Sequence, residues 1–176
     1  MRRVVVMVLA AVLVGLAGCT GAVERLPAAR DDPRVVSHLG RLGIQFGDTR
    51  AELEREYGLV QVASDCAPRL PGHPAVSPVF DGDRLVLLWV DPPLRTPAGL
   101  MAGSPVDQVY EAHPGVTELP EPDRPFAYHG LLATVPDPAA GDRAYLFLHD
   151  GSVVQKVIVG YERAARQLYT EQFGVC

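Results

Sequence analysis

The hydrophobic pattern opens with an unbroken apolar run over residues 4–16, which follows Arg2 and Arg3 and precedes two small residues. A helix that crosses a membrane needs about 20 apolar residues, so this run is too short to span a bilayer. A basic start, a short apolar run and small residues are together typical of a secretory signal peptide. We therefore predict that residues 1–18 direct export and are then removed.

Beyond residue 42 the pattern changes to short elements that occur twice. Residues 43–49 align with residues 99–105, and a helical pattern of apolar positions follows each of these segments. Further along, residues 79–90 and 146–159 each hold an Asp-Gly pair between apolar segments, which indicates an antiparallel hairpin. The second copy carries an insertion before its hairpin.

Both expected helices have residues that favour a helix start. Thr49 and Glu52 have the spacing of a capping box, in which each side chain binds the other residue's backbone N–H. Ser104 is the expected cap of the second helix, with Pro105 in its first turn, where a missing N–H costs nothing.

These elements predict an α+β fold. Two tandem helix-plus-antiparallel-hairpin repeats, at about residues 43–91 and 99–160, are expected to form one curved antiparallel sheet with helices on one face. The repeats lie in a domain over residues 43–176. Residues 19–42 are rich in Ala, Arg, Asp and Pro without clear periodicity, and we expect them to be a tether.

The apolar run ends in Leu-Ala-Gly-Cys at residues 16–19, which resembles the lipobox of bacterial lipoproteins. The resemblance implies cleavage before Cys19 and acylation of its thiol and of its new amino group. The expected location is extracytoplasmic, with the protein held at the cell membrane through the lipid anchor on Cys19. The alternative is an ordinary signal peptide followed by a cysteine that carries no lipid.

The chain has three cysteines, which is an awkward number for an exported protein. Lipidation of Cys19 would leave Cys66 and Cys176, which can form a disulfide in an oxidising compartment. The alternative is a reactive thiol, although neither cysteine has a neighbouring histidine or a second cysteine at CxxC spacing.

The start of the first repeat, its capped helix and its Asp-Gly hairpin resemble the BamE-like (SmpA/OmlA) envelope lipoproteins. Two tandem copies resemble the architecture of β-lactamase-inhibitor protein. Residues 95–104 resemble the repeat junction of a group of actinobacterial secreted proteins, in which a cysteine after the first helix recurs with a Gly-x-Cys terminus. The resemblance implies an envelope location and this fold more than a particular activity.

One strand of each hairpin is apolar on both faces, so one of those faces is a candidate binding surface. Strict alternation places Leu85, Leu87 and Trp89 on one face, and Lys156 and Ile158 occupy matching positions in the second copy. Because a lysine is costly to bury, we expect that face to be open. Leu87, Trp89, Lys156 and Ile158 are therefore the predicted partner contacts. The alternative is that termini or insertions cover this face.

Charge and motifs restrict the chemistry. The formal net charge is −5, and it becomes −7 when Arg2 and Arg3 leave with the signal, which argues against nucleic-acid binding. The five histidines show no metal-ligand spacing, and Asp81-Gly82-Asp83 lacks the remaining ligands of a calcium loop. No phosphate-binding or nucleophile motif is present. We therefore expect no metal, no cofactor and no catalytic residue.

These observations favour a non-enzymatic module that binds an envelope protein or an envelope polymer. One alternative is an envelope hydrolase or transferase whose carboxylates and histidines meet only in the fold. Another is a carrier of a soluble ligand, which would need an enclosed cavity.

Overall fold

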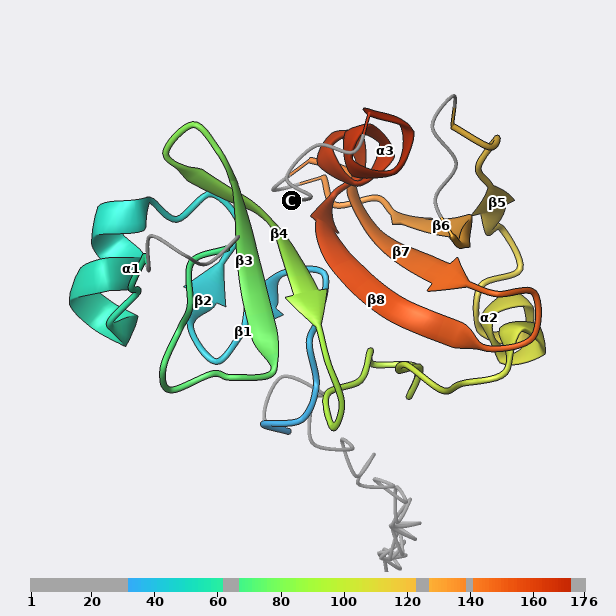
Figure 1. Cartoon of the computed structure of the whole chain (residues 1–176), viewed down its shortest axis with the longest axis horizontal. Helices are drawn as coiled ribbons and strands as arrows, with labels where there is room; N and C mark the ends of the chain where they lie inside the picture. Colours follow the sequence, from blue (N-terminus) through green and yellow to red (C-terminus); the bar gives the residue numbers. More distant parts are fainter. Residues whose placement is uncertain (1–31, 62–66, 123–126, 139–140, 172–176) are drawn as a thin grey trace, which may run out of the picture.

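The computed structural model describes residues 32–61, 67–122, 127–138 and 141–171, and within these ranges the fold is α+β, as predicted (Figure 1). A sheet of six antiparallel strands forms its centre, in the order β3-β4-β8-β7-β6-β5, and β1 pairs with β2 in a separate small sheet. The strands are β1 Gly40–Arg41, β2 Ile44–Gln45, β3 Val76–Asp81, β4 Arg84–Val90, β5 Thr117–Glu118, β6 His129–Val135, β7 Arg143–His149 and β8 Val154–Tyr161. The helices are α1 Arg50–Tyr57, α2 Val106–Ala112 and α3 Glu162–Glu171.

The folded domain includes residues 32–42, which the sequence pattern assigns to the tether. Val36 is only 1% exposed, and its backbone N–H donates to the carbonyl oxygen of Arg95 at 2.9 Å. β1 also lies within this segment. The few apolar residues of this segment lie among Pro, Arg and Asp and show no periodicity, because the segment forms turns and a two-residue strand and not a long helix or strand.

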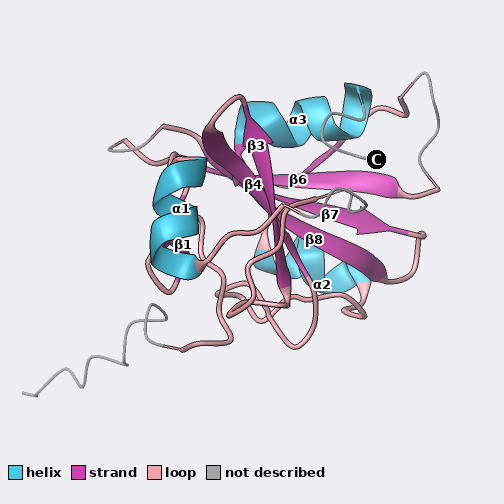
Figure 2. Cartoon of the chain, turned by 60° about the vertical axis from the view of Figure 1, so that its left-hand side comes forward, coloured by secondary structure: helices cyan, strands magenta, loops and turns pink. Residues whose placement is uncertain are grey.

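Helices cover both faces of the sheet, so the prediction of helices on one face is wrong (Figure 2). α1, α2 and the β1–β2 hairpin pack on one face, which we name the α1/α2 face, through residues that include Leu53 and Val109. α3 packs on the other, which we name the α3 face, against β4, β7 and β8. The sheet is thus the middle of three layers.

α3 was not expected from the sequence, which left its segment unassigned. Its apolar positions lie at the spacing of one helix face, and all four are buried against the sheet: Ala164, Ala165, Leu168 and Tyr169. Its other six residues are all charged or polar, and three of them are exposed, so the apolar stripe is narrow. The stripe fits over the sheet because Gly130 has no side chain, and the ring of Tyr169 occupies the space there.

The two predicted helix caps had different outcomes. The capping box of α1 is confirmed, since Glu52 N donates to Thr49 Oγ1 and Thr49 N donates to the Glu52 carboxylate. The cap of α2 is wrong, because its N-cap is Pro105 and no side chain binds there. The Ser104 hydroxyl instead accepts the N–H of Met101 at 3.0 Å, which fixes the turn before the helix.

The segments that lead into α1 and α2 make matching backbone hydrogen bonds to the strand after an Asp-Gly turn. The first set joins Gly47 N to Leu85 O, Leu85 N to Asp48 O and Arg50 N to Asp83 O, at 2.8, 2.8 and 3.1 Å. The second set joins Gly103 N to Val154 O, Val154 N to Ser104 O and Val106 N to Ser152 O, at 2.7, 2.8 and 3.0 Å.

β4 and β8 are neighbouring strands of the sheet, with Trp89 directly opposite Ile158. A register shift between Val79 and Phe80, on the partner strand β3, interrupts the alternation of β4. Leu85 therefore belongs to the α1/α2 face, whereas Leu87 belongs to the α3 face. Strict alternation placed Leu85 and Leu87 together, which the irregular register contradicts.

Gly160 allows β8 to pass close to β4. Its φ is +152°, and a Cβ at this position would lie 2.1 Å from the carbonyl oxygen of Val86. We predict that Gly160→Ala lowers the free energy of unfolding by about 3 kcal/mol or more, because backbone and not a flexible side chain blocks the methyl group.

Gly151→Ala is the control, since Gly151 has φ +99° and open space where its Cβ would lie. Its expected cost is about 1 kcal/mol, from the backbone conformation alone. Urea denaturation of both variants measures the difference, and equal losses would show that close strand approach at Gly160 is unimportant.

Candidate functional site

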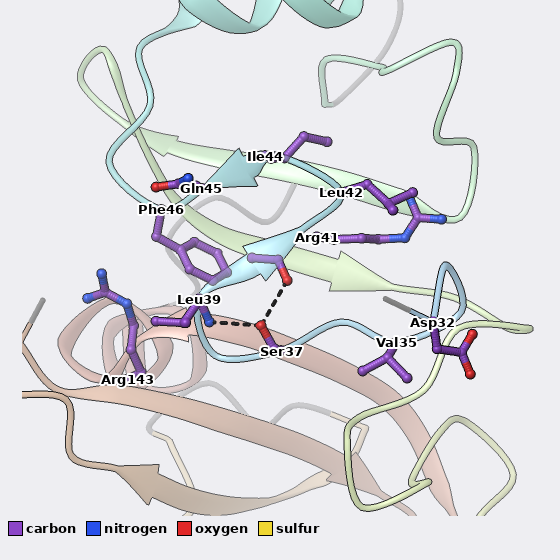
Figure 3. Close-up of a pocket in the computed structure, with 12 residues that line it drawn as sticks. Asp32, Val35, Ser37, Leu39, Arg41, Leu42, Ile44, Gln45, Phe46 and Arg143 are labelled. Atoms are coloured by element: carbon purple, nitrogen blue, oxygen red, sulfur yellow. Dashed lines mark hydrogen bonds between the residues drawn. The ribbon is translucent and has the colours of Figure 1, made fainter. Parts of the chain in front are cut away.

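A cleft of about 350 Å³ lies between the β1–β2 hairpin, the segment before it and the first residue of β7 (Figure 3). Its walls combine apolar side chains with polar groups, and they include Val35, Ser37, Leu39, Leu42, Phe46 and Arg143. The volume is at the lower end of the range of pockets that bind small molecules.

Two tight turns form most of this cleft. Ser37 and Gly40 exchange backbone hydrogen bonds at 3.0 and 3.1 Å, and the Leu42-Gly43 turn then joins β1 to β2. Gly40 is required in the first turn, because a Cβ there would lie 1.9 Å from the carbonyl oxygen of Ile44. The Ser37 hydroxyl also donates to Gly40 O and accepts from Leu39 N, both at 3.2 Å. These bonds hold the cleft wall in one conformation.

Leu42 stands at the rim in an unfavourable state. Its φ is +46°, the left-handed conformation that favours glycine or asparagine, and 47% of the residue is exposed to solvent. A leucine at this position therefore adopts a costly backbone conformation, and its side chain gains little stabilisation from burial. Strain of this kind concentrates at ligand-binding positions.

Arg41 fastens the hairpin to two other segments. Its Nη1 lies 2.6 Å from Nδ1 of His73, and its Nη2 donates to the carbonyl oxygen of Pro33 at 2.9 Å. Burial, and then the adjacent Arg41 guanidinium, hold the pKa of His73 below its usual value, so the imidazole accepts in its neutral form. Nε of Arg41 is buried and has no hydrogen-bond partner within the described structure.

Arg143 forms the inner wall. It is 3% exposed, and its guanidinium carbon lies 3.7 Å from the ring centroid of Tyr161 and 5.7 Å from that of Phe46. A guanidinium held over aromatic rings is stabilised by the negative face of the ring. The cleft therefore brings together two arginines, a hydroxyl and an apolar surface. Such a lining suits a ligand that carries a hydrogen-bond acceptor beside an apolar group.

The predicted partner contacts have a different environment from the one expected. Leu87 and Ile158 are fully buried beneath α3, so the prediction that they lie on an open face is wrong. Trp89 and Lys156 are half-buried beside them. Nζ of Lys156 lies 2.5 Å from Oδ1 of Asp91, and this ion pair keeps the lysine charge at the solvent boundary of the α3 face.

The predicted lipidation site Cys19 and the predicted disulfide partners Cys66 and Cys176 lie outside the described residues. Among the described residues, no group of three or more His, Cys, Asp and Glu side chains could hold a metal ion. The helices in the same ranges include none that is long and apolar enough to cross a membrane.

The cleft was not predicted from the sequence pattern, because most of its lining comes from the segment whose composition indicates a tether. A signal was present in Gly40 and Gly43, which punctuate short apolar positions as turn residues do. Arg143 had no signal, because its role depends on the distant Phe46 and Tyr161 rings.

No family model matches the chain, and comparisons with curated proteins and with solved structures also found no match.

We predict that Leu42→Asn raises the free energy of unfolding by about 1 kcal/mol, because asparagine tolerates the left-handed conformation that leucine adopts at a cost. Val60→Asn is the control, since Val60 is 43% exposed and is not among the residues with positive φ. Chemical denaturation measures both variants. A loss of stability in Leu42→Asn would show that the leucine side chain stabilises the fold and that its strain is unrelated to binding.

Proposed function

We propose that this protein is an extracytoplasmic lipoprotein, anchored by a lipid on Cys19, whose domain is a non-enzymatic module that binds an envelope protein or polymer. The observation that carries the proposal is the cleft, in which Nε of Arg41, without a hydrogen-bond partner among the described residues, accompanies the strained and exposed Leu42. A ligand with an acceptor oxygen beside an apolar group would cover the Leu42 side chain, and it would satisfy Nε of Arg41 once that side chain turns toward it.

The cost of each feature supports a binding role. A buried donor without a partner costs about 1–3 kcal/mol, and a leucine in the left-handed conformation costs about 1–2 kcal/mol. Neither feature stabilises the free domain. A ligand that covers the Leu42 side chain would offset the second cost, and a rearrangement of the Arg41 side chain on binding would give its Nε–H an acceptor.

The position of the cleft suits a partner near the membrane. Asp32 lines the cleft and lies thirteen residues after Cys19 in the chain. A fully extended chain of that length reaches about 45 Å, so an anchor at Cys19 would keep the cleft within this distance of the bilayer.

We also propose that the domain consists of two tandem BamE-like repeats. The matching hydrogen bonds before α1 and α2 support this, because they join the same aligned positions in both halves. The register of β4 and β8 adds support, since Trp89 and Ile158 are matched positions and lie opposite each other. Two related hairpins that meet about a local twofold axis would pair in this way.

Intact mass spectrometry of the exported protein tests the anchor. We predict a chain that begins at Cys19, with the added mass of diacylglycerol and of a fatty acyl group, and with Cys66 and Cys176 joined in a disulfide. Cys19→Ser should prevent the modification and release the protein from the membrane fraction. An unmodified wild-type chain that starts at another residue would contradict the proposed anchor.

Photo-crosslinking in intact cells tests binding at the cleft. We predict that a photoreactive amino acid in place of Leu42 captures one discrete envelope component, because this side chain stands at the rim. The control position is Tyr110 on α2, which is 45% exposed and therefore almost equally accessible. Equal adducts from both positions would contradict a partner at the cleft, and so would the absence of adducts at Leu42.

A further inference from the structure

Two histidines face each other at the far end of β7 from the cleft. His129 of β6 lies directly opposite His149 of β7, and their ring centroids are 5.4 Å apart. His149 is 6% exposed, whereas His129 is exposed to solvent. A buried imidazole that is close to a second imidazole is poorly placed to carry a positive charge.

The hydrogen bonds of His149 define its protonation state. The backbone N–H of Gly151 donates to Nδ1 of His149 at 3.1 Å, so the neutral ring carries its proton on Nε2. That Nε2 is buried and has no hydrogen-bond partner among the described residues. Uptake of a second proton would place it on Nδ1, where it would point at the Gly151 N–H and break this hydrogen bond.

The charged groups around the His149 ring come from three segments. Burial is the first cause of a lowered pKa at His149, and the neighbouring His129 on β6 lowers it further. Glu118 on β5 and Asp150 in the turn after β7 act in the opposite direction without reversing the shift. His149 is therefore neutral in the closed structure at pH values where a free imidazole already takes up a proton.

The turn beside His149 holds α2 in place. Oδ1 of Asp150 accepts the N–H groups of Ser152 and Val153 at 2.9 and 3.0 Å, which shapes this turn. Residues 152–154 then form the hydrogen bonds described above with residues 103–106, directly before and at the start of α2. We name these two segments, 103–106 and 152–154, the α2 docking pair.

We propose that the His129–His149 pair is a proton-sensitive switch, in which proton uptake by His149 opens the α2 docking pair. One proton moves from solvent to Nδ1 of His149, the hydrogen bond from Gly151 is lost, and no covalent bond changes. The turn then loses its anchor on β7, and the segment before α2 loses its partner. Val106 and Val109, which are 7% and 0% exposed in the closed structure, become accessible. The switch does not depend on the lipid anchor or on a ligand in the cleft.

The sign of the pH dependence follows from the state that binds the proton. In an open state His149 titrates near its ordinary value of 6.5, whereas the closed state resists protonation until lower pH. The hydrogen bonds of the α2 docking pair therefore hold fully above pH 6.5. They weaken as the pH falls from 6.5 toward the lower pKa that His149 has in the closed state. Opening takes up one proton, so its equilibrium constant rises up to about tenfold for each pH unit in that interval.

Amide hydrogen exchange on the full chain between pH 7.5 and 5.5 tests the switch, with a chelator present to exclude adventitious metal. The reporters are the N–H groups of Gly103, Val106 and Val154, after correction for the intrinsic effect of pH on exchange. We expect their opening to increase below pH 6.5 in the wild-type protein. His149→Asn retains an oxygen that can accept the Gly151 N–H but cannot titrate, so this variant should show no increase.

His73→Asn is the matched control, because Nδ1 of His73 also accepts a hydrogen bond but lies at the β1–β2 hairpin. It should leave the increase at the three reporters unchanged. His129→Asn provides a test at an exposed residue, where loss of folding is not expected. Removal of this imidazole removes one cause of the lowered closed-state pKa of His149, so the rise in opening between pH 7.5 and 5.5 should be smaller than in the wild type. Reporters that do not respond to pH in the wild type, or a response that persists in His149→Asn, would overturn the proposal. An unchanged rise in His129→Asn would overturn the role of the pair.

Discussion

The central constraint on this fold is that the middle strands of the sheet are apolar on both faces. Every residue of β7 is buried, and β8 places Val157 and Val159 on one face and Ile158 on the other. An antiparallel sheet often keeps one face in water, but that arrangement would expose several large side chains here. Two covering layers are therefore required, with α1, α2 and the β1–β2 hairpin on one side and α3 on the other.

β7 connects the two sites that we propose. Arg143 at its start forms the inner wall of the cleft, and His149 at its end faces His129. The strand is held on both edges, by β6 and by β8, over its whole length. The ladder with β6 is continuous, whereas the ladder with β8 has a register shift between Leu148 and His149. A change in the turn after His149 need not disturb the cleft, because the continuous ladder with β6 holds the strand between the two ends. Binding and proton uptake can therefore operate independently.

The sequence predicted those parts of the fold that depend on neighbouring residues. The capping box of Thr49 and Glu52 and the hairpin turns at Gly82 and Gly151 are local, and the structure contains them. The irregular register of β4 was not predictable, because it arises where Val79 and Phe80 meet that strand. The apolar positions of α3 have the spacing of a buried helix face. The helix was not predicted because the sheet surface on which this face packs exists only after the strands have paired.

The candidate site was harder to predict than the fold, because its groups come from segments that interact only after folding. Arg41 meets His73, and Arg143 meets Phe46 and Tyr161, across long stretches of chain. No spacing rule relates such residues. The expectation that Leu87 and Ile158 lie on an open face was wrong for a related reason, since the pattern along a strand does not show what covers its faces.

The pairing of β4 with β8 has a consequence for the order of folding. It joins residues 87–90 to residues 157–160, which are separated by most of the second half of the chain. Contacts between such distant positions close a long loop and form slowly compared with a local hairpin. During synthesis from the N-terminus, the β3–β4 hairpin emerges well before β8, its neighbour in the sheet. Its inner edge and the side chain of Leu87 therefore stay uncovered until the last strand and α3 arrive. An uncovered strand edge of this kind is prone to pair with other chains. A partner that binds extended segments would therefore protect the chain before folding is complete.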